Sequence, residues 1–387
     1  MKVRNFLFAL FLSVVTSLLL VGCEQEANQQ QVDVAANLPL TGNLSVYGSP
    51  VQEGARMALS DLESDTSTGP KIVFDWGDNQ GDPNRTVSVM QQQLLDSPDI
   101  YTSGVKPQTM AIESQIESEG LPHFVWIFDV KVNKSGNNNF RTWVSFKNDT
   151  QAYLEYAKEV DPERAFIVYV KLPHTQEAYE ERLAPAFRNQ GVSEVEVESF
   201  GTDLRDFKTL AQKIQAFGPD FIVLNGFQSD LVSLIRAMRP LGLIENGNTI
   251  AAYDMLDAAN SLDPEELEGI RVTAPNFTLY PDQGRVAEWR DRFEDRYGKE
   301  PFYTHAYAYD MVQIIHNAGT RLDLPASSDE WIQAIGNTDM QGITGPLRFD
   351  EDGSLITPIG VGVYRDGELV PDTSVSVPLE PHAADSE

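Results

Sequence analysis

A polar segment follows the third predicted strand of the chain and opens a predicted helix: Lys106-Pro107-Gln108-Thr109. The first N–H groups of a helix have no partner inside the helix, and the helix dipole is positive there, so such a start suits a carboxylate. Gln108 adds an amide and Thr109 a hydroxyl. Lys106 either pairs with an anionic group of a ligand or is a solvated loop lysine, and the sequence leaves both open. These residue types predict a site for the anionic end of a small polar molecule.

The residue patterns that catalysis or metal binding needs are missing. The single cysteine excludes a disulfide framework and a cysteine-based zinc site. The five histidines form no HExxH motif and no i,i+4 pair. There is no GxSxG motif, no phosphate loop and no GxGxxG that opens a helix, and the acidic run at 350–353 is too short for a calcium loop and is typical of a hairpin turn. The sequence predicts no catalytic residue, no metal site and no cofactor, and therefore a protein that is not an enzyme.

The N-terminus has the features of a bacterial lipoprotein signal peptide, predicted over 1–22. Lys2 and Arg4 precede an apolar run from Phe6 to Leu20, which is short for a membrane-spanning helix. The run ends in Leu20-Val21-Gly22-Cys23, a lipobox pattern in which the cysteine is diacylated with palmitate or a similar chain. Cys23 is the predicted lipidation site; the alternative is an ordinary signal peptide in which this cysteine is incidental. The polar residues 23–31 are a predicted tether.

Charge and length narrow the class of protein further. The chain has 387 residues with 29 Lys and Arg against 58 Asp and Glu, a net charge of −29. Phosphate binding needs clustered basic residues, so nucleic acid is excluded as a partner. The length fits two domains. The predicted protein is a monomer with a soluble folded body, lipid-anchored at the periplasmic or other extracytoplasmic face of the cell membrane or the outer membrane.

The body alternates strand-like and helix-like segments, and the pattern restarts near its middle. The predicted strands are 32–38, 71–76, 100–103 and 122–128 in the first run, and 165–170, 195–199, 220–224 and 249–252 in the second. Helices separate them, among them 149–160, 177–190, 205–217 and 229–241, and further helices follow at 284–297, 305–321 and 328–336. This alternation predicts an α/β fold of two doubly wound parallel-sheet lobes.

A series of short motifs gives the chain a family resemblance. In order they are Asn37-Leu38-Pro39-Leu40-Thr41-Gly42 with Tyr47-Gly48 and Gly54-Ala55, Asp78 with Asp82-Pro83, Arg141-Thr142, Asp203-Leu204-Arg205-Asp206-Phe207, Pro219-Asp220-Phe221-Ile222-Val223, Gly226-Phe227, Tyr307-Ala308-Tyr309-Asp310 and Gly345-Pro346-Leu347-Arg348-Phe349-Asp350. The chain resembles the type I periplasmic solute-binding proteins of ABC importers, of the leucine/isoleucine/valine-binding kind. The resemblance covers about Val32 to Val370.

This resemblance implies two lobes joined by a three-strand hinge. Lobe one is expected over 32–143 plus 275–347, lobe two over 144–274 plus 348–377, and a tail over 378–387. The crossings are expected near 141–146, 270–275 and 346–350. Ligands of open α/β sheets lie beyond the carboxyl ends of the strands, so two such edges facing each other form a site that closes by hinge motion.

The resemblance also assigns ligand contacts to loops that follow strands. It places Tyr47, His174 and Phe227 in or near the pocket, and it brings Phe302 into the site from lobe one. It gives Asp254 the role of holding a ligand ammonium group; the alternative is a cap on the following helix.

After the fourth strand the chain departs from its relatives. Where relatives have small residues, this chain has Trp126 and Phe128, which either line the site, stack on a ligand or fill the core. The departure argues against a plain branched-chain amino acid.

The predicted function is a solute-binding lipoprotein of an ABC importer for an amino acid or a related small polar metabolite. An acid opposite a hydroxyl and an amide suits a zwitterion, since buried charged groups need partners. Its partners are then the solute and the ABC permease and ATPase subunits. The alternative is a regulatory or sensory lipoprotein on the same fold, such as an activator of a cell-wall synthase, because Glu24 after Cys23 does not retain a lipoprotein at the inner membrane under the enteric sorting rule.

Overall fold

The computed structural model describes residues 30–64, 69–128, 138–245 and 247–378. The predicted signal peptide, Cys23, most of the predicted tether and all but the first residue of the predicted tail lie outside the described residues. Among the helices described, none combines the length and the apolar character that a membrane crossing requires.

Lobe one is built on a parallel sheet in the order β2-β1-β3-β4-β5. Its strands are β1 (Gln31–Leu38), β2 (Lys71–Asp78), β3 (Ile100–Gly104), β4 (His123–Trp126) and β5 (Asn139–Arg141). The helices of this lobe are α2 (Ser45–Ser64), α3 (Pro83–Gln93), α4 (Lys106–Ser118), α13 (Gly284–Tyr297), α14 (Tyr303–Gly319) and α15 (Ser328–Gly336), and the small ladder of β11 (Met340–Gln341) and β12 (Pro346–Leu347) completes it. Apolar residues dominate β1 and β4, as expected for strands covered on both faces.

Lobe two repeats the strand order of lobe one and adds two antiparallel strands. Its sheet runs β7-β6-β8-β9-β10-β13-β14, parallel up to β10. The strands are β6 (Arg164–Val170), β7 (Glu194–Phe200), β8 (Phe221–Leu224), β9 (Thr249–Ala251), β10 (Arg271–Pro275), β13 (Ile359–Arg365) and β14 (Glu368–Pro371). The helical elements are α5 (Phe146–Val160), α6 (Pro173–Gln176), the π-helical η3 (Glu177–Leu183), α7 (Ala184–Asn189), α8 (Lys208–Phe217), α9 (Gln228–Met238), α10 (Met255–Ala258), α11 (Pro264–Leu267) and α12 (Asn276–Leu279).

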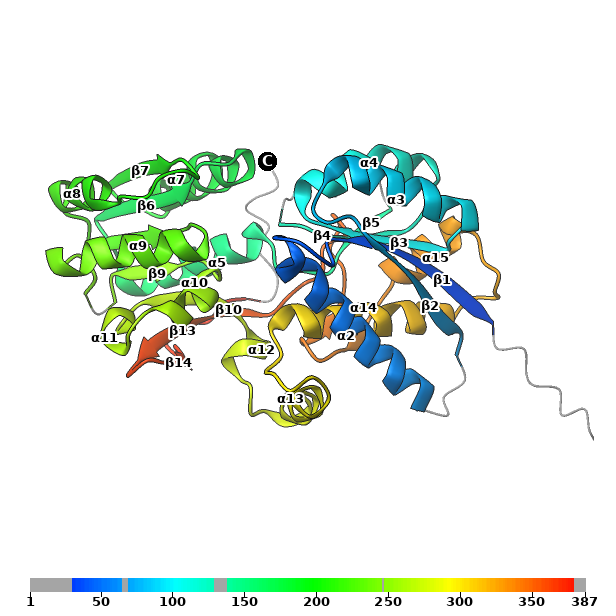
Figure 1. The fold of residues 1–387 in the computed structure, drawn as a ribbon. Coiled ribbons are helices and arrows are strands. Elements are labelled where there is room, and N and C mark those ends of the chain that lie inside the picture. Colours follow the sequence, from blue (N-terminus) through cyan, green and yellow to red (C-terminus); the bar gives the residue numbers. More distant parts are fainter. Residues whose placement is uncertain (1–29, 65–68, 129–137, 246, 379–387) are drawn as a thin grey trace, which may run out of the picture.

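Both lobes therefore have the doubly wound topology that the sequence predicts, and the predicted fold class is confirmed. Figure 1 shows the two sheets side by side, with β1–β5 on the right and β6–β10 on the left. In each sheet the strand order reverses beside the first strand, between β1 and β3 in lobe one and between β6 and β8 in lobe two. Such switch points leave a crevice at the carboxyl ends of the strands, which is where ligands bind in open α/β sheets.

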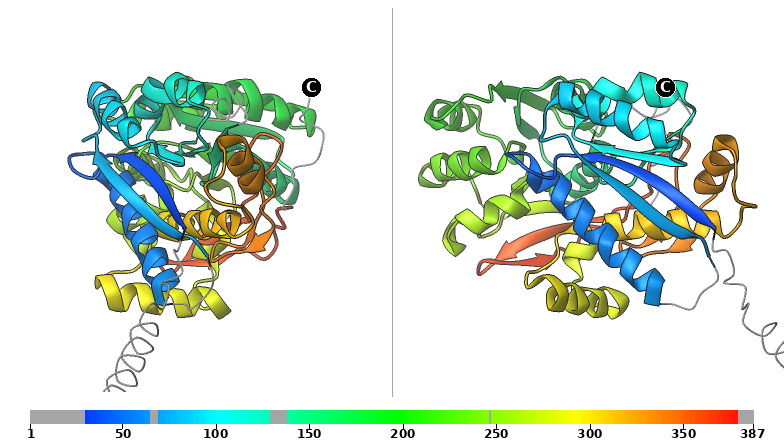
Figure 2. Two further views of the ribbon diagram at one scale, coloured as in Figure 1. Left: turned by 90° about the vertical axis from the view of Figure 1, so that its right-hand side faces the viewer. Right: turned by 45° about the vertical axis from the view of Figure 1, so that its right-hand side comes forward.

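The long helix α2 packs against α14, which returns to lobe one from the far end of the chain. Figure 1 and the right-hand view of Figure 2 both show the two helices beside each other. Gly54 permits the close approach, because a Cβ at this position would lie 2.0 Å from the carbonyl oxygen of His305. Polar contacts add to the packing, since Arg292 and the Tyr309 hydroxyl both bind the Asp61 carboxylate. This pairing fixes the α2 start, which carries Tyr47, relative to the α14 start, which carries Tyr303.

The chain passes between the lobes after β5, after β10 and before β13. Arg141, at the end of β5, pairs with the returning segment: its N–H donates to Gly353 O and its carbonyl accepts from Leu355 N, both at 2.8 Å. The rings of Phe140 and Phe349 lie 5.1 Å apart. The segment at 348–355 therefore packs on lobe one, and the chain joins the second sheet at Ile359 rather than at the crossing expected near 346–350. The sequence pattern placed this crossing early because the Asp350 turn separates two short strand-like runs.

Several element bounds also differ from those predicted. β1 begins at Gln31, inside the predicted tether, because Gln31 pairs with Lys71. The helix expected over 205–217 begins at Lys208. The helix expected over 177–190 is divided, with a π-helical stretch before α7.

Candidate functional site

A chain of stacked and edge-on aromatic rings joins the two lobes at the carboxyl ends of their strands. We call it the aromatic seam, and its members are His174, Phe146, Phe128, Tyr253, Tyr303 and Phe302. Successive ring centroids lie 5.8, 6.0, 5.0, 6.2 and 4.0 Å apart. Phe128, Tyr303 and Phe302 belong to lobe one, and the other three to lobe two. The Phe128–Tyr253 contact is the place where one lobe stacks on the other, at an interplanar angle of 27°.

Asp254 lies at this seam, directly after Tyr253. It precedes the short helix α10, but its side chain makes no capping hydrogen bond, so the capping alternative has no support in the geometry. The carboxylate is partly buried. Burial, reinforced by the neighbouring Asp257 carboxylate, raises the pKa of Asp254 to about 7.

Tyr47 reaches the same place from lobe one. It lies in the first turn of α2, partly buried against the main hydrophobic core. Burial raises the pKa of its phenol, and the negative charges of Asp254 and Asp257 raise it further. The phenol of one lobe and the carboxylates of the other are thus close enough to interact electrostatically across the seam.

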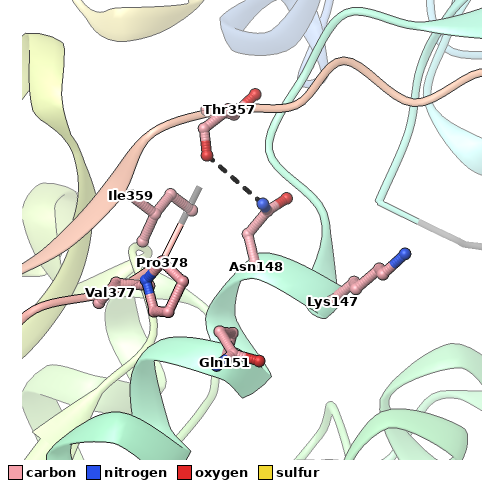
Figure 3. A pocket seen from close by; sticks show the side chains of 7 residues that line it. All are labelled: Lys147, Asn148, Gln151, Thr357, Ile359, Val377 and Pro378. Carbon is pink, nitrogen blue, oxygen red and sulfur yellow. Dashed lines mark hydrogen bonds between the residues drawn. The ribbon is translucent and has the colours of Figure 1, made fainter. Parts of the chain in front are cut away.

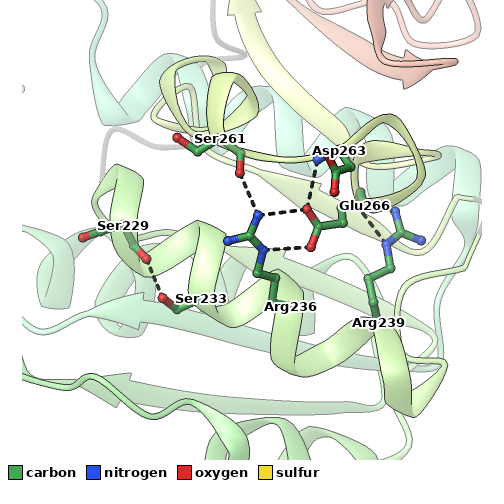
Figure 4. A network of polar contacts seen from close by, with 7 residues as sticks. All are labelled: Ser229, Ser233, Arg236, Arg239, Ser261, Asp263 and Glu266. Carbon is green, nitrogen blue, oxygen red and sulfur yellow. Dashed lines mark hydrogen bonds and ion pairs between the residues drawn. The ribbon is translucent and has the colours of Figure 1, made fainter.

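An exposed network of polar contacts holds the segment that carries Asp254. The guanidinium of Arg236 on α9 binds the Glu266 carboxylate at 2.8 Å and donates to the carbonyl of Ser261 at 2.9 Å (Figure 4). Arg239 donates to the carbonyl of Glu266. Exposed ion pairs contribute little to stability, but this one joins the end of the α10 segment to α9 and so restrains the position of Asp254.

A second acid, Asp149, lies fully buried close to Asp254. It is in the first turn of α5 with 1% of its side chain exposed, and neither carboxylate oxygen has a hydrogen-bond partner among the described residues. Burial raises its pKa to about 8; the nearby Thr273 hydroxyl lowers the pKa in part, and the Asp254 charge raises it. The Thr273 hydroxyl completes no hydrogen bond of good geometry, and the Asn225 amide oxygen has no partner either.

Two tyrosines of lobe two surround this acid. The hydroxyl oxygens of Tyr153 and Tyr179 lie 3.5 Å apart, and their rings 6.4 Å. Both are buried, and burial raises the pKa of each well above its ordinary value, with the Asp149 charge adding to the rise. A carboxylate in such surroundings is neutral unless a cation joins it, because an unpaired buried charge is costly.

The polar residues predicted at the start of α4 make contacts within lobe one. The Gln108 amide nitrogen donates to the carbonyl of Gly81. The Thr109 hydroxyl pairs with Ser103 Oγ at 2.9 Å, and that oxygen pairs with His123 Nε2 at 2.8 Å. Gln108 and Thr109 are buried, and Lys106 is partly buried. No contact within the described ranges joins these three residues to the aromatic seam.

The helix start itself has the features that suit an anion. Val105 precedes α4 with φ at 67°, a strained conformation for a β-branched residue, and no side chain caps the helix. Its first N–H groups therefore have no side-chain partner. Position alone does not make this a site.

Two further predicted residues lie apart from the seam. Phe227 is 41% exposed at the start of α9, and no ring contact in the described part of the chain joins it to the seam. Trp126 is buried in lobe one, where its indole nitrogen donates to Thr102 Oγ1 at 3.0 Å, so it fills the core. Phe128 lines the interface between the lobes.

A small hollow lies beside the hinge, away from the seam. Figure 3 shows it between the start of α5 and the start of β13, where Asn148 donates to the carbonyl of Thr357 at 3.5 Å. Its other lining residues are Lys147, Gln151, Ile359, Val377 and Pro378. No group of three or more potential metal ligands occurs among the described residues.

Sequence reasoning did not find Asp149 as a site residue. The signal is present in the helix, because an acid occupies the same apolar stripe as Ala152, Tyr153 and Tyr156. An acid on a buried helix face is rare without a partner, and this pattern marks it.

Comparisons with known proteins agree with this architecture. The profile of the family described as periplasmic binding protein matches residues 31–368. The Leu/Ile/Val-binding protein homolog 1 of Brucella melitensis is 24% identical over 350 residues, which cover 86% of this chain and 89% of that protein. An ABC transporter substrate-binding protein from Sphaerobacter thermophilus has the same fold, with a TM-score of 0.76 and 17% identity over 88% of this chain and 96% of that chain. A solute-binding protein of an ABC transporter from Rhodopseudomonas palustris, in complex with p-hydroxybenzoic acid, superposes with a TM-score of 0.74 and 16% identity, covering 88% and 95% of the two chains.

Proposed function

The chain belongs to the periplasmic binding protein family, and on that premise we propose that it is the extracytoplasmic solute-binding component of an ABC importer, taking an amino acid or a related small metabolite with an amino group. The solute binds between the lobes at the aromatic seam, and closure of the hinge presents it to the permease and ATPase subunits. Cys23 anchors the protein to the membrane by its lipid.

The observation that supports this proposal is the Asp254 carboxylate. It follows β9 at the carboxyl edge of lobe two, it caps no helix, and it faces Tyr47 of the other lobe. A carboxylate between two lobes suits a ligand ammonium group, and the surrounding aromatic rings form the apolar walls usual in small-molecule sites. An aromatic acid such as that held by the Rhodopseudomonas protein has a carboxylate and no amine, so it does not suit this acidic surrounding.

Thermal unfolding of the purified protein tests the proposal. The panel is amino acids, amides, urea and aromatic acids. A solute at 100 times its Kd raises the free energy of unfolding by about 2.7 kcal/mol, which is a readable shift in Tm. We expect an amine-bearing solute to give the shift and Asp254→Asn to remove it, with Glu159→Gln, an exposed acid on α5, as the control that leaves it unchanged.

Two results would contradict the proposal in different ways. A shift from a solute without an amine, unaffected by Asp254→Asn, would keep solute binding and remove the assigned site. No shift from any solute at millimolar concentration would favour the regulatory or sensory alternative on the same fold.

A further inference from the structure

The buried acid Asp149 has no role in the fold that its contacts explain. Both of its oxygens lack a hydrogen-bond partner, although the side chain is 1% exposed and lies in the first turn of α5. Native proteins pair buried polar atoms almost always, and an unpaired one in a native structure requires an explanation. A group held ready for a ligand is one such explanation, because the ligand then supplies the missing partner.

The neighbouring oxygens share this property. Thr273 Oγ1 on β10 and Asn225 Oδ1 after β8 are also buried without a partner among the described residues. These atoms come from three different elements of lobe two, at the same end of the sheet as the aromatic seam. Together with Asp149 they offer hydrogen-bond acceptors in excess of donors, which is the arrangement that a ligand rich in N–H groups would satisfy.

The charge of the surroundings has one sign. The charged side chains that act on the two acids are themselves acidic: Asp254 on Asp149, and Asp257 on Asp254. The remaining titratable groups that interact with Asp149 are the phenols of Tyr153, Tyr179, Tyr253 and Tyr303. A zwitterion brings one positive and one negative charge, so it neutralises one of two carboxylates at most.

We infer that Asp149 is a second ligand-binding carboxylate beside Asp254, and that the solute is an organic cation with more positive than negative charge, such as a diamine or a basic amino acid. The inference rests on the proposed function, because it adds a residue and a charge to the same site. Aromatic rings at the seam favour an organic over an inorganic cation, since a cation is attracted to the face of a ring. The described residues also offer no third acidic or imidazole ligand for a metal ion.

Binding of such a cation is linked to loss of protons. The raised pKa values of Asp149 and Asp254, about 8 and about 7, mean that the ligand-free site is partly protonated near neutral pH. An alkylamine stays charged throughout that range. Each proton released on binding makes Kd about tenfold tighter for each pH unit below the pKa concerned. We therefore expect the Kd of a diamine to fall as the pH rises from 6 to 8.

Calorimetric titration of the purified protein with three probes tests the inference. The probes are 1,4-diaminobutane with two positive charges, L-lysine with a net charge of one, and L-leucine with none. We expect Asp149→Asn to weaken the two basic probes about 30-fold or more, as loss of one partner of a buried charge pair does, and Glu159→Gln on the same helix to leave them unchanged. The substitution keeps the shape of the side chain and removes no hydrogen bond, so a Tm at least equal to that of the parent checks the fold.

The outcomes separate the inference from the function on which it rests. Tight binding of L-leucine, with no binding of the basic probes and no effect of Asp149→Asn, overturns the inference and leaves solute binding in place. Binding of the basic probes with an unchanged Kd in Asp149→Asn also overturns it. Failure of all three probes together with the wider panel overturns the proposed function itself.

Discussion

The two lobes treat their buried polar groups differently. In lobe one, the hydroxyls of Thr109 and Ser103 and the Nε2 atom of His123 bond to one another behind the start of α4. In lobe two, the oxygens of Asp149 and Thr273 lie equally deep and complete no hydrogen bond in the described structure. Folding stability is served by the first arrangement and reduced by the second. The difference indicates that lobe two holds most of the recognition chemistry and that lobe one covers it.

The largest expected effect concerns pH and the ligand-free protein. Because the pKa of Asp149 is raised to about 8 in the folded state, the folded protein keeps a proton that the unfolded chain loses above about pH 4. The free energy of unfolding therefore falls as the pH rises between these values and levels off above about pH 8. Urea unfolding of the parent and of Asp149→Asn across this range should show a difference on the order of a few kcal/mol, in favour of the variant at high pH.

A flat pH response that is identical in the two proteins would mean that Asp149 is solvated or paired in solution. Asp254, with a pKa of about 7, contributes a slope of the same sign between about pH 4 and pH 7. The double variant Asp149→Asn/Asp254→Asn should therefore be flatter than either single variant.

The second effect concerns the bonded groups of lobe one. Ser103→Ala leaves the Thr109 hydroxyl and His123 Nε2 without their partner, so we expect the free energy of unfolding to drop by about 1–3 kcal/mol. The Kd for the solute should stay within about twofold. Chemical unfolding and titration of the same sample measure both. Ser88→Ala, which removes an exposed serine bonded within α3, is the matched control. A large loss of affinity would mean that the α4 start contacts the ligand, as the sequence predicts.

The smallest effect concerns the place where the lobes touch. Phe128→Ala removes the ring that stacks on Tyr253 at 5.0 Å, and aromatic pairs of this kind contribute about 0.5–1.5 kcal/mol beyond their buried area. We expect a Kd weaker by about three- to tenfold, because the closed arrangement loses a contact that the open one does not have. Phe74→Ala removes a stacked pair with Trp76 inside lobe one and should leave Kd unchanged. Equal losses in the two variants would show a general effect on stability.

The fold was predictable from the sequence because its signals are local and repeated. Buried strands such as Phe221–Leu224 are apolar throughout, and amphipathic helices such as Ser328–Gly336 agree with the structure at both ends. The third crossing was placed too early, since a turn at Asp350 resembles the entry to a strand. Nothing in the local sequence records that the residues after it still pair with Arg141 of lobe one.

The site was less predictable, because it depends on contacts between distant segments. The sequence pattern selects the loops after strands, and the structure brings His174, Phe128 and Phe302 into one aromatic seam with Asp254 beside it. It also selects Phe227, which is exposed, and the residues at the start of α4, which bond inward. Their roles in binding remain predictions. Asp149 was missed because helix periodicity reads it as the start of a helix, whereas its burial arises only when α5 packs on lobe two.

The last strands of the chain have a consequence for how the protein is assembled. β13 pairs with β10 and β14 with β13, so the sheet of lobe two, which begins with β6, gains its final edge only from residues near the C-terminus. α14 likewise reaches α2 across most of the sequence. A chain that emerges N-terminus first cannot finish either lobe until nearly all of it is available. Such non-local closure slows folding, and it keeps the polypeptide in the extended state that a secretion channel accepts.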